Sequence, residues 1–152
     1  MRPKTASPNP APAARAAQVH QDCVCLSLRR AARSVARRYD EALRPLDLNN
    51  GQFSMLNVVA GLQPASVQAV ADHLAMDRTT VTAALKPLAR RGLVEMAVSA
   101  SDLRSREVAL TRQGSTLLAK AVPIWQQAQA QLASDLGDAD FGGLRRQLSA
   151  LR

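Results

Sequence analysis

The stretch from residue 67 to residue 114 constrains the fold of this chain more than any other part. Asp77 is a good N-cap and opens a helix there. Apolar residues then recur at the i, i+4, i+7 spacing of one buried helix face, at Val81, Leu85 and Leu88. Gly92 follows two arginines at the position where such a helix would end. A shorter amphipathic helix, capped by Ser66, is expected just before the helix that begins at Asp77. Two short helices with a tight connection, the second polar on its outer face, indicate a helix-turn-helix.

A β-hairpin is predicted directly after these helices. Two segments with strand character, residues 93–98 and 106–110, flank a polar turn, and Thr111 then caps a new helix. A hairpin attached to a helix-turn-helix is a wing. Its tip carries Arg104 and Arg106, which places positive charge where a wing can reach a polyanion.

In these segments the chain resembles the MarR (multiple-antibiotic-resistance regulator) family of winged-helix regulators. The wing signature of that family is matched at Asp102, Arg104, Val108, Leu110, Thr111 and Gly114. Its recognition helix and exit are matched by Thr80-Val81-Thr82 and by Arg91-Gly92-Leu93-Val94. The resemblance covers roughly residues 22–151. It implies a homodimer, in which the first and last two helices intertwine, that binds double-stranded DNA.

We therefore predict a mainly α fold with a small β-hairpin wing, a winged helix-turn-helix with N- and C-terminal dimerisation helices. Residues 1–21 are rich in proline and alanine and are predicted to be a disordered tail. Residues 22–152 are predicted to form a single MarR-like domain. Within it, residues 49–111 would make the DNA-binding lobe, and residues 22–48 and 112–152 the dimerisation helices.

The helices that flank the lobe carry apolar stripes longer than a small lobe can cover. One is expected over residues 22–46 and another from Thr111 to about Leu136, with Pro123 bending the second. Asp138 is expected to cap a last helix over residues 139–151. The surplus apolar surface most simply buries against a second copy of the chain.

Charge and composition limit the classes of binding partner that this chain can have. The net charge of +8 favours a polyanion, either nucleic acid or an anionic membrane surface. No apolar run approaches the length of a membrane span, so no membrane partner is expected. Two cysteines make no disulfide framework, which favours a reducing, cytoplasmic and nucleoid-associated location.

The recognition helix would place its N-terminal end nearest the base edges. The candidates for base contact there are Arg78, Thr79, Thr80 and Thr82. Lys86 and Arg90 are expected to reach phosphates, and Arg104 and Arg106 a neighbouring minor groove or backbone. Asp102 is expected to hold the wing, because phosphates repel a carboxylate. The operator should be a pseudo-palindrome with half-sites about one helical turn apart.

Two positions in this helix depart from the family pattern. Ala83 stands where many members carry an arginine, so direct reading of a base at that position is not expected. Pro87 lies inside the helix and removes one N–H donor. A kink there would change the angle at which the helix enters the groove.

Cys23 and Cys25 allow three interpretations. They can be small buried apolar residues. They can be thiol sensors, because a helix N-terminus and arginines such as Arg29 favour the reactive thiolate. The organic-hydroperoxide-sensing branch of the family also has a cysteine early in its first helix, but it uses several tyrosines where this chain has only Tyr39. Together with His20 they could also bind zinc or copper.

A small-molecule effector is the other expected route of control. The resemblance implies a pocket between the dimerisation helices and the DNA-binding lobe, filled by phenolic or carboxylate compounds. Arg33, Phe53 and His73 are the candidates to line it, although His73 can also be an ordinary helical residue. Such an effector would favour one spacing of the two recognition helices over another.

The predicted function is that of a sequence-specific DNA-binding transcriptional regulator, a homodimeric repressor released from its operator by a small phenolic or carboxylate ligand. The alternative is a peroxide-sensing repressor that uses Cys25, Cys23 or both, and a distant one is a protein-interaction module without DNA. The sequence has no glycine-rich phosphate loop and no paired carboxylates beside a nucleophile, so neither an enzyme nor a cofactor is expected.

Overall fold

A computed structural model describes residues 10–99, 105–137 and 140–151. It is mainly α with one small antiparallel sheet, which confirms the predicted fold class. In chain order the elements are α1 (Pro10–Asp22), α2 (Val24–Leu43), the 3-10 helix η1 (Arg44–Leu46), α3 (Asn50–Leu62), β1 (Ala65–Ser66), α4 (Val67–Leu74), α5 (Arg78–Arg90), β2 (Val94–Val98), β3 (Arg106–Leu110), α6 (Arg112–Asp135) and α7 (Phe141–Ser149).

The chain divides into two compact units, Met1–Val35 and Ala36–Arg152, with the boundary inside α2. In the first unit, residues 10–22 form α1, whereas the sequence analysis predicted a disordered tail over residues 1–21. Alanine has the highest helix propensity, and Pro10 occupies the first helical position, where a missing N–H costs nothing. These local preferences outweighed the proline content on which the prediction rested. Residues 1–9 lie outside the described part of the chain.

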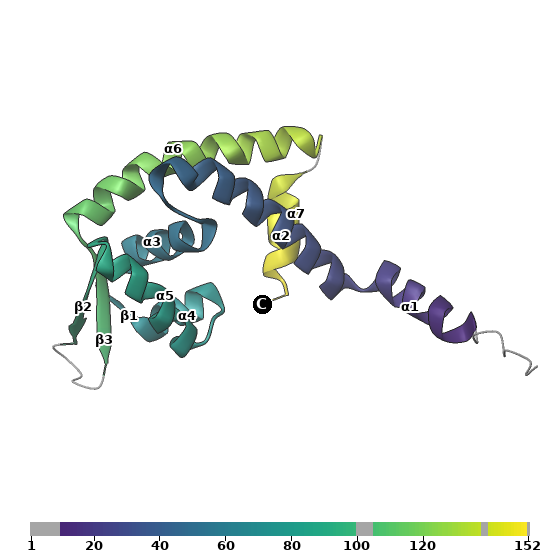
Figure 1. The fold of residues 1–152 in the computed structure, drawn as a ribbon, viewed down its shortest axis with the longest axis horizontal. Coiled ribbons are helices and arrows are strands. Elements are labelled where there is room, and N and C mark those ends of the chain that lie inside the picture. The colour runs from purple at the N-terminus through teal and green to yellow at the C-terminus, as the bar shows by residue number, and fades with distance from the viewer. Residues whose placement is uncertain (1–9, 100–104, 138–139, 152) are drawn as a thin grey trace, which may run out of the picture. The chain divides into compact units, whose positions relative to one another are not determined.

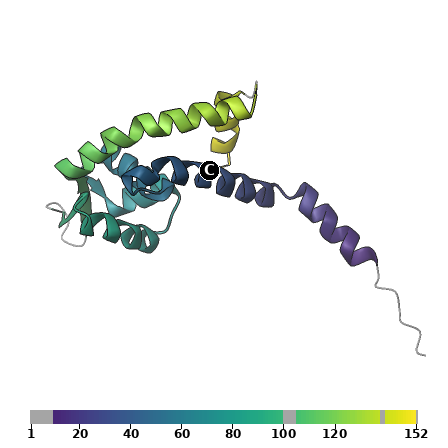
Figure 2. The same ribbon diagram turned by 45° about the horizontal axis from the view of Figure 1, so that its top comes forward.

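In the second unit, α3, α4 and α5 gather on one side of α6, and the strands lie near the N-terminal end of α6 (Figures 1 and 2). Their apolar faces meet in one core. Side chains with no exposed surface are Leu43, Leu56, Val59, Val70, Ala71, Val81, Leu85, Leu88 and Ala121. The three residues of α5 in that set are those predicted from helical spacing to be buried.

Side-chain caps begin four helices where the sequence placed them. Asn49 and Gln52 form the predicted capping box, with N–H···O distances of 2.8 and 3.1 Å. Ser66, Asp77 and Thr111 cap α4, α5 and α6, each by accepting a backbone N–H with its side-chain oxygen. The last helix differs, because Asp140 is its N-cap residue and makes no side-chain bond there. Asp138, the predicted cap, lies outside the described residues.

The sheet contains one strand more than the predicted hairpin. β2 and β3 pair antiparallel from Val94 opposite Leu110 to Val98 opposite Arg106. The short β1 pairs with the other edge of β3, with Ala65 opposite Val108, so the strand order is β1-β3-β2. β1 ends at Ser66, the cap of α4, and therefore fixes the first helix of the helix-turn-helix to the base of the wing.

The prolines inside α5 and α6 do not break these helices. α5 continues through Pro87, and α6 through Pro123. The second half of α2 is tied to α6 by an ion pair between Arg38 and Asp135 and by a hydrogen bond that the Tyr39 hydroxyl donates to Gln129.

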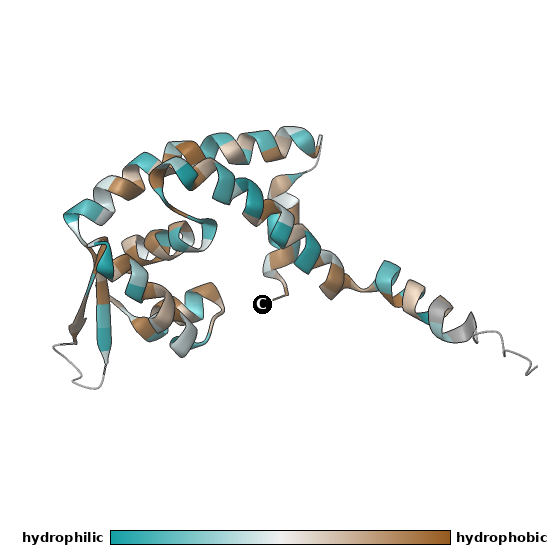
Figure 3. Cartoon of the chain, in the orientation of Figure 1, coloured by the Kyte–Doolittle hydropathy of each residue, from teal (hydrophilic) through white to brown (hydrophobic). Residues whose placement is uncertain are grey.

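Apolar side chains remain exposed on the last helix. Within one chain, Leu144 and Leu148 of α7 and Leu151 just after it keep 41%, 40% and 67% of their surface accessible. Figure 3 shows hydrophobic segments on α7. Within the described ranges, none of the helices combines the length and the apolar character that a bilayer crossing requires.

Candidate nucleic-acid interface and adjoining pocket

The N-terminal half of α5 presents a polar, solvent-exposed surface. The side chains of Arg78 and Thr79 are exposed and make no hydrogen bond or ion pair to any residue that the structure describes. Lys86 and Arg90, the predicted phosphate contacts, are exposed farther along the same helix. The structure thus leaves these side chains free to meet another macromolecule.

The hydroxyl groups of Thr80 and Thr82 already donate hydrogen bonds within or beside α5. Thr80 donates its hydroxyl proton to the Asp77 carboxylate, and Thr82 donates to the carbonyl of Arg78 at 2.8 Å. A hydroxyl that donates internally still has lone pairs. Thr80 and Thr82 are therefore available to a DNA base only as acceptors, for example from an exocyclic amino group.

Asp77 orders the first turn that carries Arg78 and Thr79. Its carboxylate accepts the Thr80 backbone N–H at 2.8 Å as well as the Thr80 hydroxyl. The side-chain bond from Thr80, followed by the backbone bond, holds the pKa of Asp77 below its ordinary value. The carboxylate is thus the form that caps α5, at the end where the helix dipole favours a negative charge.

Arg91, at the C-terminal end of α5, has a role that the sequence analysis missed. Its guanidinium donates to the carbonyl of Asp47 at 2.6 Å and to that of Leu46 at 3.4 Å. It also lies 3.5 Å from the Asp47 carboxylate. These bonds join the end of the recognition helix to the connection between α2 and α3. The motif marked this arginine, but partners more than forty positions away gave no local signal.

The base of the wing is joined closely to the start of α6. The Thr111 hydroxyl donates to the carbonyl of Gly92 at 2.6 Å, and the Thr111 N–H donates to the carbonyl of Leu93 at 3.1 Å. Gly114 lies so close that a Cβ there would come within 1.9 Å of the Leu93 carbonyl oxygen. Only glycine allows this approach, which explains the last position of the wing signature.

The tip of the wing falls outside the described residues, and Asp102 and Arg104 with it. Arg106 begins β3, opposite Val98, and its side chain is exposed. The expected roles of Asp102 and Arg104 remain predictions.

The two cysteines differ in environment. Cys23 is half-buried at the start of α2, where its Sγ accepts the N–H of Leu26 at 3.4 Å. Cys25 is exposed in the single chain, so it is not buried within one protomer. His20 contacts Arg30 at 3.3 Å, and in the described part of the chain no three His, Cys, Asp or Glu side chains gather as a metal site. The zinc or copper interpretation has no support.

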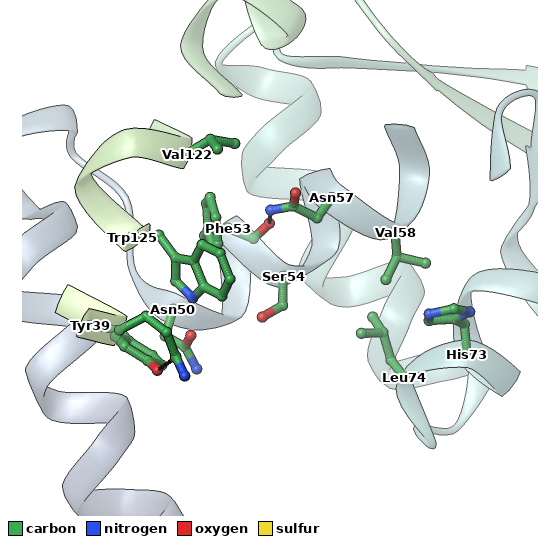
Figure 4. Close-up of a pocket in the computed structure, with 11 residues that line it drawn as sticks. Tyr39, Asn50, Phe53, Ser54, Asn57, Val58, His73, Leu74, Val122 and Trp125 are labelled. Carbon is green, nitrogen blue, oxygen red and sulfur yellow. Dashed lines mark hydrogen bonds between the residues drawn. The ribbon is translucent and has the colours of Figure 1, made fainter. Parts of the chain in front are cut away.

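A cavity of about 560 Å³ lies in the second unit between α2, α3, α4 and α6 (Figure 4). Its lining residues are Tyr39, Asn50, Phe53, Ser54, Asn57, Val58, His73, Leu74, Val122, Trp125 and Gln129. Phe53 and His73 line it as predicted, and Arg33 does not. Arg33 is exposed on α2 six residues before Tyr39, and residues six apart do not share a helix face.

Comparison with known proteins gives the chain its family. A model of the MarR family matches residues 46–105. The structure resembles the M. tuberculosis transcriptional regulator MosR in complex with DNA, with 37% identity, a TM-score of 0.77, and coverage of 86% of this chain and 93% of that one.

Two further relatives agree. The transcriptional repressor CouR bound to a 23-mer DNA duplex is 26% identical, with a TM-score of 0.78 and coverage of 88% of this chain and 94% of that one. The organic hydroperoxide resistance transcriptional regulator of Bacillus subtilis (strain 168) is 29% identical over 101 residues, which are 66% of this chain and 69% of that protein. The winged helix-turn-helix, its wing signature and these relatives together show that the chain belongs to the MarR family of transcriptional regulators.

Proposed function

We propose that this chain is a homodimeric, sequence-specific DNA-binding repressor whose operator affinity is lowered by a small molecule in the cavity beside Trp125. The observation that carries the proposal is the exposed, capped N-terminal turn of α5, with Arg78 and Thr79 free at its surface. A cytoplasmic location, with DNA as the partner, follows from this role.

The contacts to DNA divide by type. Arg78 reads a guanine edge through two parallel hydrogen bonds, and Thr79, Thr80 and Thr82 contact neighbouring base edges. Lys86, Arg90 and Arg106 neutralise phosphates, which positions the protein without reading sequence. Arg104 extends the wing toward the adjacent minor groove, and Asp102 holds the wing.

The apolar surface of α7 supports the homodimer. Leu144, Leu148 and Leu151 lie exposed in one chain, and a second copy would bury them. A two-fold dimer presents two copies of α5, so the operator is a pseudo-palindrome with half-sites about one helical turn apart.

The cavity supports control by a ligand because its walls join the DNA-binding lobe to a predicted dimerisation helix. His73 and Leu74 belong to α4, the first helix of the helix-turn-helix, whereas Trp125 belongs to α6. A ligand that contacts both favours one arrangement of these helices. It lowers DNA affinity if that arrangement differs from the one that binds the operator.

Fluorescence anisotropy tests the DNA-binding role. The duplex is a labelled segment from upstream of the protein's own gene, and a shuffled duplex gives the background. Arg78→Ala should lose about 1–3 kcal/mol of discrimination at one base position. Lys86→Ala is the matched control, because it should weaken binding to both duplexes equally and reduce the salt slope by about one. Equal losses on both duplexes for Arg78→Ala would refute its assignment as a base-reading residue.

Thiol sensing is the second candidate function. The half-buried Cys23 at the α2 N-terminus and the exposed Cys25 favour it, as does the likeness to the hydroperoxide regulator. In this scheme a thiolate attacks an organic hydroperoxide, giving a sulfenic acid and releasing an alcohol. A second thiol then forms a disulfide and releases water.

Single substitutions separate the roles of the two thiols. If sensing operates, hydroperoxide abolishes operator binding by reduced protein and dithiothreitol restores it. Cys23→Ser and Cys25→Ser, tested one at a time, show which sulfur reacts first. Unchanged operator binding by the oxidised wild-type protein would reject thiol sensing and leave ligand control.

A further inference from the structure

The cavity beside Trp125 has an aromatic wall. Phe53 and Trp125 stack with ring centroids 6.1 Å apart and an interplanar angle of 29°. Val58, Leu74 and Val122 add aliphatic surface around the pair. The volume of about 560 Å³ is in the usual range for small-molecule sites. A flat, apolar ring system suits such walls.

The polar groups of the cavity are mostly uncharged. Ser54 lies between Trp125 and the pair formed by His73 and Leu74, and it has no hydrogen-bond partner within the described residues (Figure 4). Asn57 donates its side-chain N–H to the carbonyl of Phe53 at 2.8 Å, which leaves its own carbonyl oxygen as an acceptor. These groups offer hydrogen bonds in both directions without a formal charge.

Tyr39 and Gln129 close the cavity with a neutral pair. The Tyr39 hydroxyl donates to the side-chain carbonyl of Gln129. Burial raises the pKa of Tyr39, so the phenol remains a protonated donor at neutral pH. The pair therefore adds no charge to the site.

No lysine or arginine lines the cavity among the residues that the structure describes. A negative charge lies beside the cavity, because the Asp40 carboxylate accepts the backbone N–H of the lining residue Asn50 at 2.6 Å. A carboxylate ligand would lose its hydration without gaining a cationic partner. Arg33, named from the sequence as a candidate lining residue, is not among the residues that line the cavity.

We infer that this cavity selects an uncharged aromatic compound carrying a hydrogen-bonding group, such as a phenol, aryl amide or aryl ester, and discriminates against aromatic carboxylates. The effect of such a compound on DNA rests on the proposed function. Its binding does not, and can be measured without DNA.

Trp125 provides the readout, because it is the only tryptophan in the chain. The probes are 4-hydroxybenzamide and 4-hydroxybenzoate, which have nearly the same shape and differ in charge. We expect saturable quenching by the amide, with a dissociation constant at least about tenfold lower than that of the carboxylate. Equal or tighter binding of the carboxylate, or saturation by neither compound, would overturn the inference.

A charge placed inside the cavity should reverse the selectivity. Ser54→Lys adds an ammonium group at a half-buried lining position, and it should strengthen carboxylate binding and weaken amide binding, each by about tenfold. Gln126→Lys is the control, because it adds the same charge at an exposed position next to Trp125 in sequence. Unchanged selectivity in Ser54→Lys, with circular dichroism showing a folded protein, would contradict the inference.

Operator anisotropy distinguishes this inference from the proposed function. If the amide binds and the operator complex is unaffected, the ligand class is correct and the release mechanism is wrong. If the protein binds its operator and the amide does not bind, the ligand class is wrong and DNA binding stands.

Discussion

The helix-turn-helix lobe and the last helix differ in how far their apolar side chains are buried within one chain. In the lobe, the apolar residues of α5 at Val81, Leu85 and Leu88 have no exposed surface. On α7, Leu144 and Leu148 occupy equally regular positions and remain about two-fifths exposed. The same spacing of apolar residues therefore occurs on a helix face that is fully buried in the core and on one that stays exposed within one chain. Periodicity indicates which face is apolar, but it does not indicate what covers that face.

The helices of the two regions also differ in the hydrogen bonds that fix their ends. α4, α5 and α6 each start with a side-chain cap, and Arg91 and Thr111 bind the ends of neighbouring elements to one another. α7 starts at Asp140 without a side-chain cap bond. The lobe is thus organised within one chain, whereas α7 depends more on its surroundings.

The largest expected effect comes from charging the exposed face of α7. Leu144→Glu with Leu148→Glu should convert the proposed dimer to a monomer, because the substitutions place carboxylates in an apolar interface. Operator affinity should fall by about 10²-fold or more, since linked binding of two half-sites is lost. Gln147→Glu, an exposed change on the same helix, is the control. A double variant that still sediments as a dimer would show that α7 is not the interface.

Gly114→Ala tests how closely the start of α6 packs against the base of the wing. The added methyl group would lie 1.9 Å from the Leu93 carbonyl oxygen, so the wing base or α6 must shift. We expect a loss of about 1–3 kcal/mol in the free energy of unfolding, measured by urea denaturation. Gly61→Ala is the matched control, because its methyl group meets nothing within 4 Å. Similar unfolding curves for the two variants would argue against the close approach.

Arg91→Gln should have a smaller effect, about 1 kcal/mol, because it removes hydrogen bonds to backbone carbonyls at a partly exposed site. Operator affinity should also fall, since α5 loses its anchor to the segment before α3. Arg44→Gln breaks only an exposed ion pair with Glu41 and should change the stability very little. If both variants behave alike, Arg91 does not position α5.

The smallest effect concerns Asp77 and pH. Because the folded-state pKa of Asp77 lies below its ordinary value of 3.8, its carboxylate stabilises the fold above that value. The contribution disappears as the pH falls through the folded-state pKa. Asp77→Asn keeps a capping side chain but cannot titrate. The difference in unfolding free energy between wild type and this variant should therefore shrink as the pH falls through 3.8 and below, and a constant difference there would contradict the pKa assignment.

Several features could be predicted because they depend on neighbours in sequence. The cap of α5 needs only Asp77 and the N–H of Thr80, three residues on, and the buried face of the same helix repeats every three or four residues. The strands of the wing are likewise read from alternation over a few residues. The wrong prediction of a disordered tail where α1 forms is also local in origin. Its proline content favours disorder, whereas its alanine content favours a helix.

The candidate DNA surface was only partly predictable. Arg78 and Thr79 are exposed as expected, but the internal hydrogen bonds of Thr80 and Thr82 restrict these residues to accepting. Those bonds depend on side-chain rotamers, which the order of residues does not specify.

By itself, the sequence determined the helix starts, the buried stripe of α5 and the wing, because each depends on contacts within a few residues. Only the tertiary structure decided the partners of Arg91, the pairing of β1 with β3, and which residues line the cavity beside Trp125. These features join residues that are dozens of positions apart. Their geometry follows from how the helices pack together, and no local pattern records it.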